Sequence, residues 1–213
     1  MGTPEDQKKE IERIFNKRAA RYDLVTFFSL TARNLIDLIS TRSINTILDI
    51  ATGTGTVAII CGKKWPESSI EAVDISYEML NRAKEKARAE NLCNIRFTRM
   101  DVEKLRYPPS SFDTITCGYG IFFLPSMESA FINILKLLKK GGQFVFSTFT
   151  QDAFHPHVPI LVDLFKEYGI EDDTPSRNRL ETEEQIEALC NQVQYDDLRI
   201  VKKEYPESIE IEV

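Results

Sequence analysis

The stretch from residue 47 to residue 61 constrains the fold of this chain most strongly. An apolar run, ILDI, ends in the sequence ATGTG at residues 51–55, and an apolar stretch typical of a helix follows at residues 57–61. This order predicts a strand, a glycine loop and a helix. Glycines let a ligand approach the backbone, and a helix N-terminus offers unpaired amides. The stretch therefore predicts a nucleotide-type pocket.

The same unit recurs along the chain. Residues 70–73 are apolar and precede a helical pattern at residues 76–90, for which Ser76 is the expected N-cap. Further strands are expected at residues 94–98, 112–117, 143–149 and 198–205, and further helices at residues 127–140, stopped by Gly141-Gly142, and at residues 182–193. Strands that alternate with helices predict an α/β fold with a Rossmann-like, doubly wound sheet. We expect seven mostly parallel strands if the acidic tail ESIEIEV also pairs.

The length of 213 residues fits one domain better than two. Residues 1–40 contain two N-terminal helical patterns and no strand pattern, so we expect a helical cap there. Residues 44–149 hold the alternating units of the expected cofactor-binding core. Residues 150–180 show no sustained period, and we expect them to form an insertion on the substrate side.

Composition excludes several classes of function. The chain has 27 Lys and Arg against 33 Asp and Glu, a net charge of −6, so nucleic acid is not an expected partner. The charged start MGTPEDQKKE and the short apolar runs predict a cytoplasmic protein without stable membrane insertion. Four cysteines without a C-x-x-C pair, and an H-x-H sequence without a third ligand, predict no metal site. The oligomeric state stays open.

Three carboxylates follow the predicted strands, at the edge where open α/β sheets bind ligands: Asp49, Asp74 and Asp101. Asp74 lies about 20 residues after the glycine loop, where a carboxylate binds ribose hydroxyls. The string GTGTVA also fits a dinucleotide fingerprint, so an NAD(P)-dependent oxidoreductase is an alternative. Asp49 argues against it, because a carboxylate there would repel a pyrophosphate, whereas it suits an ammonium or sulfonium group. S-adenosylmethionine carries both cations.

Several motifs between residues 44 and 148 occur in a familiar order: LDIATGTG, DISYEML, MDVEKL, FDTITCGYGIFFL and LKLLKKGGQFVFSTF. With them the chain resembles the class I S-adenosylmethionine-dependent methyltransferases. Ala51 stands where the commonest form has glycine, a substitution familiar in the subgroup that makes ubiquinone and menaquinone. The resemblance implies methyl transfer from S-adenosylmethionine to a small-molecule acceptor by in-line displacement. A non-catalytic S-adenosylmethionine-binding protein is a third alternative.

The resemblance also implies roles for individual residues. Gly53 and Gly55 would shape the loop under the methionine part of the cofactor, and Asp49 would lie near its amino group. In the adenosine part, the ribose hydroxyls would bind Asp74, the adenine ring would pack on Ile75 and Met79, and the adenine amino group would donate to Asp101, with the Val102 amide beside it. Gly118 would offer backbone at the end of the fourth strand. With Ala51, these form the predicted cofactor-binding set.

The acceptor side is predicted from aromatic residues. The sequence FNKRAARYD resembles the helix that caps the cofactor in the quinone C-methyltransferases, in which the tyrosine, here Tyr22, faces the pocket. Where that subgroup typically has Arg-Asn after the fourth strand, this chain has Phe122-Phe123, which favours an apolar acceptor pocket or another subgroup. The residues predicted to line this pocket are Tyr22, Tyr119, Phe122, Phe123, Phe149 and Phe154. Tyr119, His155 and His157 are unranked candidates for a proton acceptor, and no catalytic residue is assigned.

Overall fold

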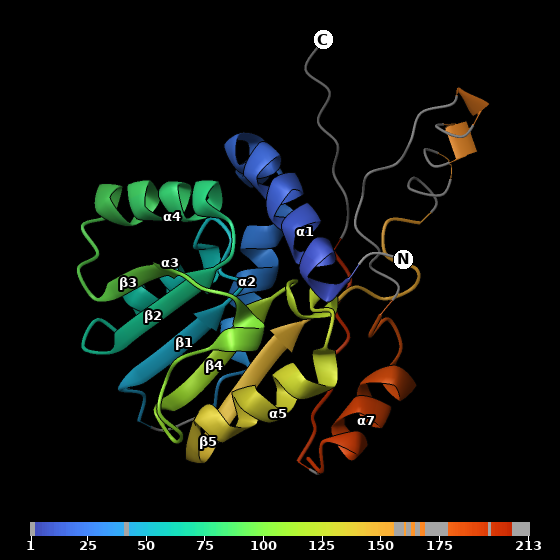
Figure 1. Cartoon of the computed structure of the whole chain (residues 1–213). Coiled ribbons are helices and arrows are strands. Elements are labelled where there is room, and N and C mark those ends of the chain that lie inside the picture. The colour runs from blue at the N-terminus through green and yellow to red at the C-terminus, as the bar shows by residue number, and fades with distance from the viewer. Residues whose placement is uncertain are drawn as a thin grey trace.

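The computed structural model describes residues 3–40, 43–155, 160, 163–164, 167–168, 179–195 and 197–205. Its centre is a five-stranded parallel sheet in the order β3-β2-β1-β4-β5 (Figure 1). The strands are β1 (Thr46–Ile50), β2 (Ser69–Asp74), β3 (Ile95–Arg99), β4 (Phe112–Gly118) and β5 (Leu138–Ser147). The alternating pattern of the sequence therefore predicted the parallel α/β sheet correctly.

The helices of the described residues are α1 (Pro4–Arg18), α2 (Phe27–Asp37), α3 (Thr56–Lys64), α4 (Tyr77–Ala89), α5 (Met127–Leu137) and α7 (Glu183–Gln192). Short 3-10 turns lie at Ala19–Leu24, Val102–Lys104 and Ile121–Phe123. The predicted N-cap of α4 is confirmed, because the Ser76 hydroxyl accepts a hydrogen bond from the backbone N–H of Met79 at 3.2 Å. A cap of this kind satisfies one of the unpaired amides of the first turn.

Side chains of the strands alternate between two layers of helices. Leu48 and Ile50 of β1 pack into a cluster with residues of α5 and α7, while Ile47 packs on the other face with residues of α2 and α3. Successive strand residues point to opposite faces, so Asp49 shares the face of Ile47 and lies toward α2 and α3. The sheet is thus covered on both sides, as its apolar strands require.

The order of the strands also locates a crevice. From β1 the chain proceeds outward to β2 and β3, and it then returns to the other side of β1 to form β4 and β5. Connections therefore diverge between β1 and β4, and ligands of open α/β sheets bind beyond the strand ends at such a point. In Figure 1, α1 lies at the end of the sheet toward which the strand arrows point, beside α4.

The prediction of seven strands was wrong for the described residues, which contain five. Residues 198–205 do not form a strand; Leu198 and Ile200 instead pack partly buried against the core. Tyr205 further along accepts a hydrogen bond at its hydroxyl from Nδ2 of Asn34 in α2, at 2.7 Å. Leu198 and Ile200 are thus buried in part by side-chain packing, without pairing to the sheet. The tail at residues 207–213 lies outside the described residues.

The boundary between α5 and β5 also differs from the prediction. The helix ends at Leu137 instead of residue 140, and β5 begins directly at Leu138, so the Gly141-Gly142 pair lies within the strand. Phe112 pairs with Leu138 and Thr114 pairs with Gln143, so residues 139–142 lie opposite one residue of β4. The pair therefore accommodates a bulge and does not stop the helix.

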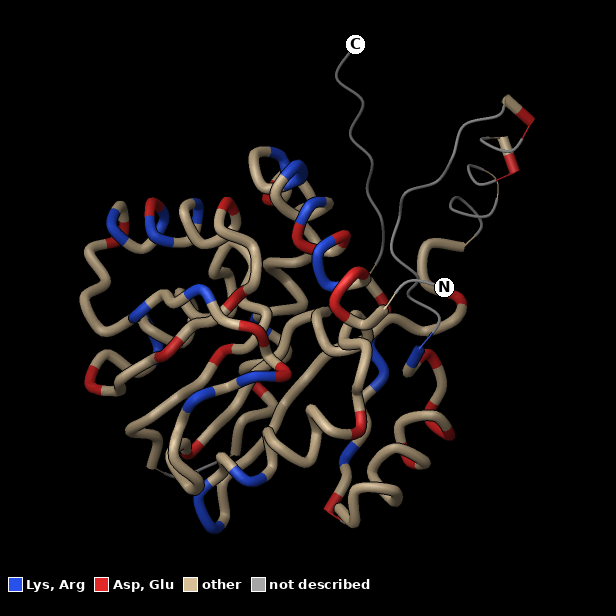
Figure 2. Tube along the Cα trace, viewed as in Figure 1, with Lys and Arg blue, Asp and Glu red and all other residues tan. Residues whose placement is uncertain are grey.

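Charged residues of both signs cover the outer surface. Figure 2 shows Lys and Arg interspersed with Asp and Glu along α1 and α4. This pattern gives a surface without a large single-sign field along these two helices. Of the helices that the structure describes, none combines the length and the apolar character needed to span a bilayer.

Candidate functional site

Two adjoining cavities lie at the carboxyl ends of the strands. The larger has a volume of about 700 Å³ and the smaller of about 460 Å³, and both volumes include space that is open to solvent. Five residues line both of them: Tyr22, Ala51, Gly53, Gly118 and Tyr119. The glycine loop after β1 and the end of β4 thus separate the two cavities, at the crevice that the strand order predicts.

The cavities collect most of the predicted cofactor-binding residues. The larger is lined by Asp74, Ile75, Met79, Asp101 and Val102 in addition to the shared residues, and the smaller by Asp49. The predicted residues therefore form two groups. The residues predicted to contact the adenosine part lie after β2 and β3, and the others lie at the glycine loop. Their roles toward a ligand stay predictions, but their convergence at one site follows from strand ends that meet at one edge of the sheet.

Gly55 is the predicted residue that lines neither cavity. A Cβ atom at this position would lie 2.8 Å from Cβ of Ala83 and 3.2 Å from a ring atom of Phe97. Such a distance is too short for real carbon atoms, so a side chain would push α4 away from the glycine loop. Gly55 therefore permits close packing of the loop on α4 and does not face the cavities.

Asp49 is a fully buried carboxylate on the wall of the smaller cavity. Its two oxygens accept hydrogen bonds from the hydroxyls of Thr52 and Thr116, at 2.5 and 2.7 Å. Burial raises the pKa of Asp49 to about 6, and the two hydroxyl donors offset part of that effect. A cation in the cavity would stabilise the charged form, so Asp49 is suited to an ammonium group.

Asp74 ties the end of β2 to the glycine loop. One oxygen accepts a hydrogen bond from the backbone N–H of Gly53 and the other from that of Ser76, each at 2.8 Å. Burial raises the pKa of this carboxyl group above its ordinary value, while the amides act in the opposite direction. Each carboxylate oxygen has a further lone pair for donors from the larger cavity. A carboxylate fixed in this way fits a vicinal diol such as that of ribose.

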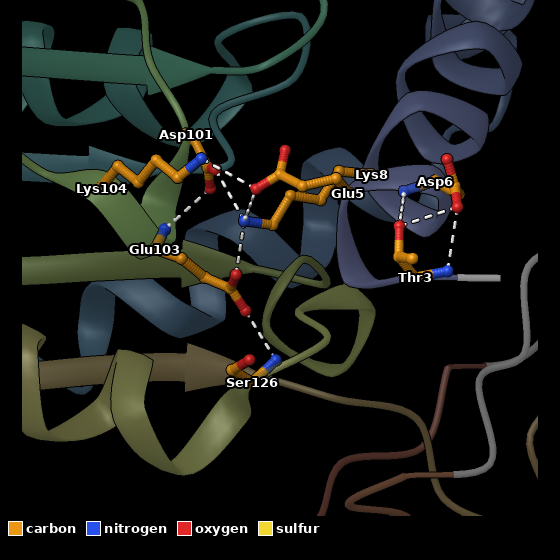
Figure 3. Close-up of polar contacts among 8 residues, drawn as sticks. All are labelled: Thr3, Glu5, Asp6, Lys8, Asp101, Glu103, Lys104 and Ser126. Atoms are coloured by element: carbon orange, nitrogen blue, oxygen red, sulfur yellow. Dashed lines mark hydrogen bonds and ion pairs between the residues drawn. The ribbon is translucent and has the colours of Figure 1, made fainter.

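Asp101 carries an ion pair that the sequence did not reveal. Its carboxylate accepts hydrogen bonds from the backbone N–H of Glu103 at 2.9 Å and from Nζ of Lys8 at 2.8 Å. Figure 3 shows Lys8 extending from α1 to these two acidic residues. Lys8 also lines the larger cavity, together with Ile11 and Phe15 of α1. Helix α1 therefore forms part of the cavity wall.

Ala51 and Gly120 fit each other across the site. Ala51 adopts a positive φ of 50°, which side chains rarely take. A Cβ atom at Gly120 would lie only 2.5 Å from Cβ of Ala51. The alanine methyl group thus occupies space that a glycine at position 120 leaves open. The alanine in the first motif, where the family commonly has glycine, is accommodated by the missing side chain after β4.

Aromatic rings surround the cavities on the side of the N-terminal helices. Tyr22 stacks on Phe28 at a centroid distance of 5.1 Å, and Tyr119 stacks on Phe149 at 4.3 Å. Phe123 lines the larger cavity and meets Phe15 of α1 edge to face at 5.4 Å. These rings form what we term the aromatic wall: Phe15, Tyr22, Phe28, Tyr119 and Phe123 line the cavities, and Phe149, which lines neither, stacks on Tyr119. It gives the site a large apolar surface for flat molecules.

The other predicted acceptor residues lie away from the cavity surface. Phe122 is fully buried in the core, and Phe154 packs behind Phe149 at 5.1 Å. His155 is exposed and lines neither cavity, and His157 lies outside the described residues. Phe28 and Thr31 of α2, which line the smaller cavity, were missed. Neither residue belongs to a motif that would have marked it as part of a site.

The two tyrosines of the aromatic wall are hydrogen-bond donors at neutral pH. Burial raises the pKa of Tyr22 and of Tyr119 to about 12 in each case. Both hydroxyls therefore keep their protons under physiological conditions. Neither serves as a general base there without a further change in its surroundings.

Comparisons with known proteins agree with this site. A family model described as a methyltransferase domain matches residues 47–142. The ubiquinone/menaquinone biosynthesis C-methyltransferase UbiE of Ectopseudomonas mendocina is 31% identical over 178 residues, which cover 78% of this chain and 67% of that protein. The chain belongs to the class I S-adenosylmethionine-dependent methyltransferases. Membership in this family sets aside the NAD(P)-dependent oxidoreductase that the glycine loop left open.

Further comparisons define how far the similarity extends. UbiE of Pseudomonas putida (strain GB-1) is 32% identical to this methyltransferase over 157 residues, 70% of this chain and 61% of that protein. The chain thus spans about two thirds of these relatives. A structure from Thermotoga maritima, described as an S-adenosylmethionine-dependent methyltransferase and possible histamine N-methyltransferase, has a TM-score of 0.64 with 18% identity. The match covers 87% of this chain and 81% of that chain, and supports the fold.

Proposed function

We propose that this methyltransferase transfers a methyl group from S-adenosylmethionine to a small, flat, largely apolar acceptor. One observation carries the proposal: Asp49 and Asp74 flank the glycine loop at the same cavities whose other side is the aromatic wall. The carboxylates and the loop suit a cationic nucleoside, and the rings suit a second, apolar molecule. Their adjacency is what a two-substrate transfer requires.

The residues present fit the proposed cofactor. Asp74 would accept from the ribose hydroxyls, Asp49 from the amino group, and Asp101 from the adenine amino group, while Ile75 and Met79 would pack on the adenine ring. When bound, S-adenosylmethionine supplies a methyl group activated by a sulfonium. The protein's contribution is then to align the acceptor with that group and to exclude water, for which the partly buried aromatic wall is suited.

The aromatic wall supports an acceptor other than the quinone precursors of the UbiE proteins. Phe122 and Phe123 stand where the quinone subgroup typically has Arg-Asn, and Phe123 adds a ring to the larger cavity. Burial keeps Tyr22 and Tyr119 protonated, so they offer hydrogen bonds but no base near neutral pH. We therefore propose an acceptor whose nucleophile loses its proton without a tyrosine's help, such as an aromatic thiol or an acidic phenol.

Calorimetric titration tests the cofactor first. We expect S-adenosylhomocysteine to bind with micromolar affinity and NAD and NADP not to bind. Preferential binding of a nicotinamide nucleotide would overturn the role proposed for Asp49. Methyl transfer is then assayed with labelled S-adenosylmethionine against aromatic thiols, acidic phenols and a demethylated quinol. Turnover of the quinol alone would contradict the proposed acceptor class, and binding without any turnover would favour a non-catalytic binding protein.

Replacing Tyr119 tests the aromatic wall. The variant Tyr119→Leu keeps an apolar side chain but loses the ring that stacks on Phe149. Because a stacked pair between the Tyr119 ring and a flat acceptor would contribute about 0.5 to 1.5 kcal/mol, we expect the KM for the acceptor found in the assay to rise about two- to tenfold. The matched control is Tyr107→Leu, whose ring packs on Phe112 at 5.1 Å, outside the cavities. Equal KM values for both variants would argue against the wall as the acceptor site.

A further inference from the structure

We propose that Lys8 is a positioning residue for cofactor recognition, which holds the Asp101 carboxylate in place at the larger cavity. Because Lys8 belongs to α1, the same contact makes binding of an adenine-bearing ligand depend on the docked helix. The inference rests on the proposed function, since it assigns Asp101 to the adenine amino group. The fold brings these two residues together although they are 93 positions apart in the sequence.

Lys8 is an unusual lysine because it is buried. The residue is only 7% exposed, and its Nζ lies 2.8 Å from Oδ2 of Asp101 and 2.5 Å from Oε2 of Glu103. Figure 3 shows the Lys8 side chain reaching these carboxylates, with Glu5 and Lys104 beside them. A buried ammonium group is costly unless it is paired and hydrogen-bonded, and here it is both.

The partners of Lys8 are themselves fixed to backbone. Oδ1 of Asp101 accepts from the N–H of Glu103 at 2.9 Å, and Oε1 of Glu103 accepts from the N–H of Ser126 at 2.6 Å. These hydrogen bonds connect the loop after β3 to the start of α5, and Lys8 contacts both carboxylates of this network. With both oxygens of Asp101 oriented, the free lone pairs face donors from the cavity.

Loss of the Lys8 ammonium group would change the orientation of the Asp101 carboxylate. Burial lowers the pKa of Lys8, but the hydrogen bonds and charges of Asp101 and Glu103 outweigh that effect and raise it above its ordinary value, so Lys8 stays charged. Without this charge, two neighbouring carboxylates would face each other in a partly buried place. Their repulsion would turn one of them outward, and an Asp101 carboxylate that has turned away no longer accepts a hydrogen bond from a ligand in the cavity.

The other ion pairs that join α1 to the described part of the sheet and its loops lie nearer the surface. Glu12 pairs with Arg99, and Glu5 pairs with Lys104, whose side chain is 60% exposed, at 2.8 Å. Exposed pairs of this kind contribute little to docking. Lys8, in contrast, lines the larger cavity together with Asp101. A ligand in this cavity therefore lies against both Lys8 and its partner Asp101.

The test compares two lysine variants of the full chain. Each variant removes one ammonium group from the same network of ion pairs. Lys8→Met removes it at the larger cavity, and Lys104→Met removes it at the surface. Calorimetry with S-adenosylhomocysteine should show binding about tenfold weaker for Lys8→Met, and affinity within twofold of wild type for Lys104→Met. Lys8→Arg, which keeps the charge, should recover part of the loss. Wild-type affinity in Lys8→Met would overturn the role of Lys8.

Two further readouts separate positioning from a purely structural role. S-inosylhomocysteine carries a carbonyl in place of the adenine amino group, so wild type should prefer the adenine ligand, and Lys8→Met should lose most of that preference. In an Asp101→Asn background, Lys8→Met should cause no further loss; independent, multiplicative losses would contradict action through Asp101.

Hydrogen exchange of the wild type tests the coupling to α1 without any substitution. S-adenosylhomocysteine should slow exchange of the amides of residues 8–18, and unchanged exchange on binding would overturn the coupling. This experiment also applies if Lys8→Met fails to fold. A wild type that binds no S-adenosylhomocysteine would overturn the proposed function itself, whereas wild-type binding combined with an unaffected Lys8→Met overturns only the inference on Lys8.

Discussion

The variant Asp74→Ala is expected to bind S-adenosylhomocysteine roughly five- to 150-fold more weakly than wild type, a loss of about 1 to 3 kcal/mol. The carboxylate is 8% exposed and accepts backbone hydrogen bonds from Gly53 and Ser76. Its removal deprives the ribose hydroxyls of their proposed acceptor. It also releases the glycine loop from the end of β2. Calorimetric titration at one pH measures the loss.

Asp113→Ala is the matched control for Asp74→Ala. Asp113 also accepts two backbone hydrogen bonds, from Asn45 and Thr46, at 2.9 Å each. It lies near the start of β1, at the end of the sheet opposite the cavities. We expect this variant to lose stability in urea denaturation while its affinity for S-adenosylhomocysteine stays within twofold of wild type. An equal loss of affinity in both variants would mean that Asp74 acts through general stability.

The parts of the site that the sequence predicted depend on local pattern. A short apolar run followed by glycines and a helical period places a loop at the end of a strand, and parallel strands bring such ends together. The sequence alone therefore places Asp49, Asp74 and Asp101 at the carboxyl edge of the sheet. In the structure all three line the cavities. Ser76 was recognised as a helix cap for the same reason, since capping depends on residues within one turn.

The parts that the sequence missed depend on long-range packing. Lys8 belongs to a helix of alternating charges and has the pattern of a solvated face; its burial results from how α1 lies against the loop after β3. Residues 198–205 have the pattern of a strand, but Leu198 and Ile200 pack against the core and no strand forms. Gly55 matches a ligand-binding motif, yet the close approach of Ala83 explains its lack of a side chain. Spacing along the chain does not encode these contacts.

Asp49→Asn is expected to change the pH dependence of stability. The pKa of Asp49 is about 6 in the folded protein against 3.8 as its ordinary value, so the folded state binds the proton more tightly than the unfolded state. Stability from this group is present below pH 3.8 and is lost as pH rises to about 6. The total loss is about 3 kcal/mol, and an uncharged asparagine does not suffer it.

Urea denaturation of wild type and Asp49→Asn between pH 3.5 and 7 measures this difference. The stability of the variant relative to wild type should increase by about 3 kcal/mol over that range, on top of a pH-independent offset from altered hydrogen bonds to Thr52 and Thr116. Affinity for S-adenosylhomocysteine should fall in the variant, because the ammonium group loses its counter-charge. Parallel stability curves would mean that Asp49 is not desolvated in the folded state. A gain in stability at neutral pH with a loss of binding would instead show that the fold retains a costly buried charge for its ligand.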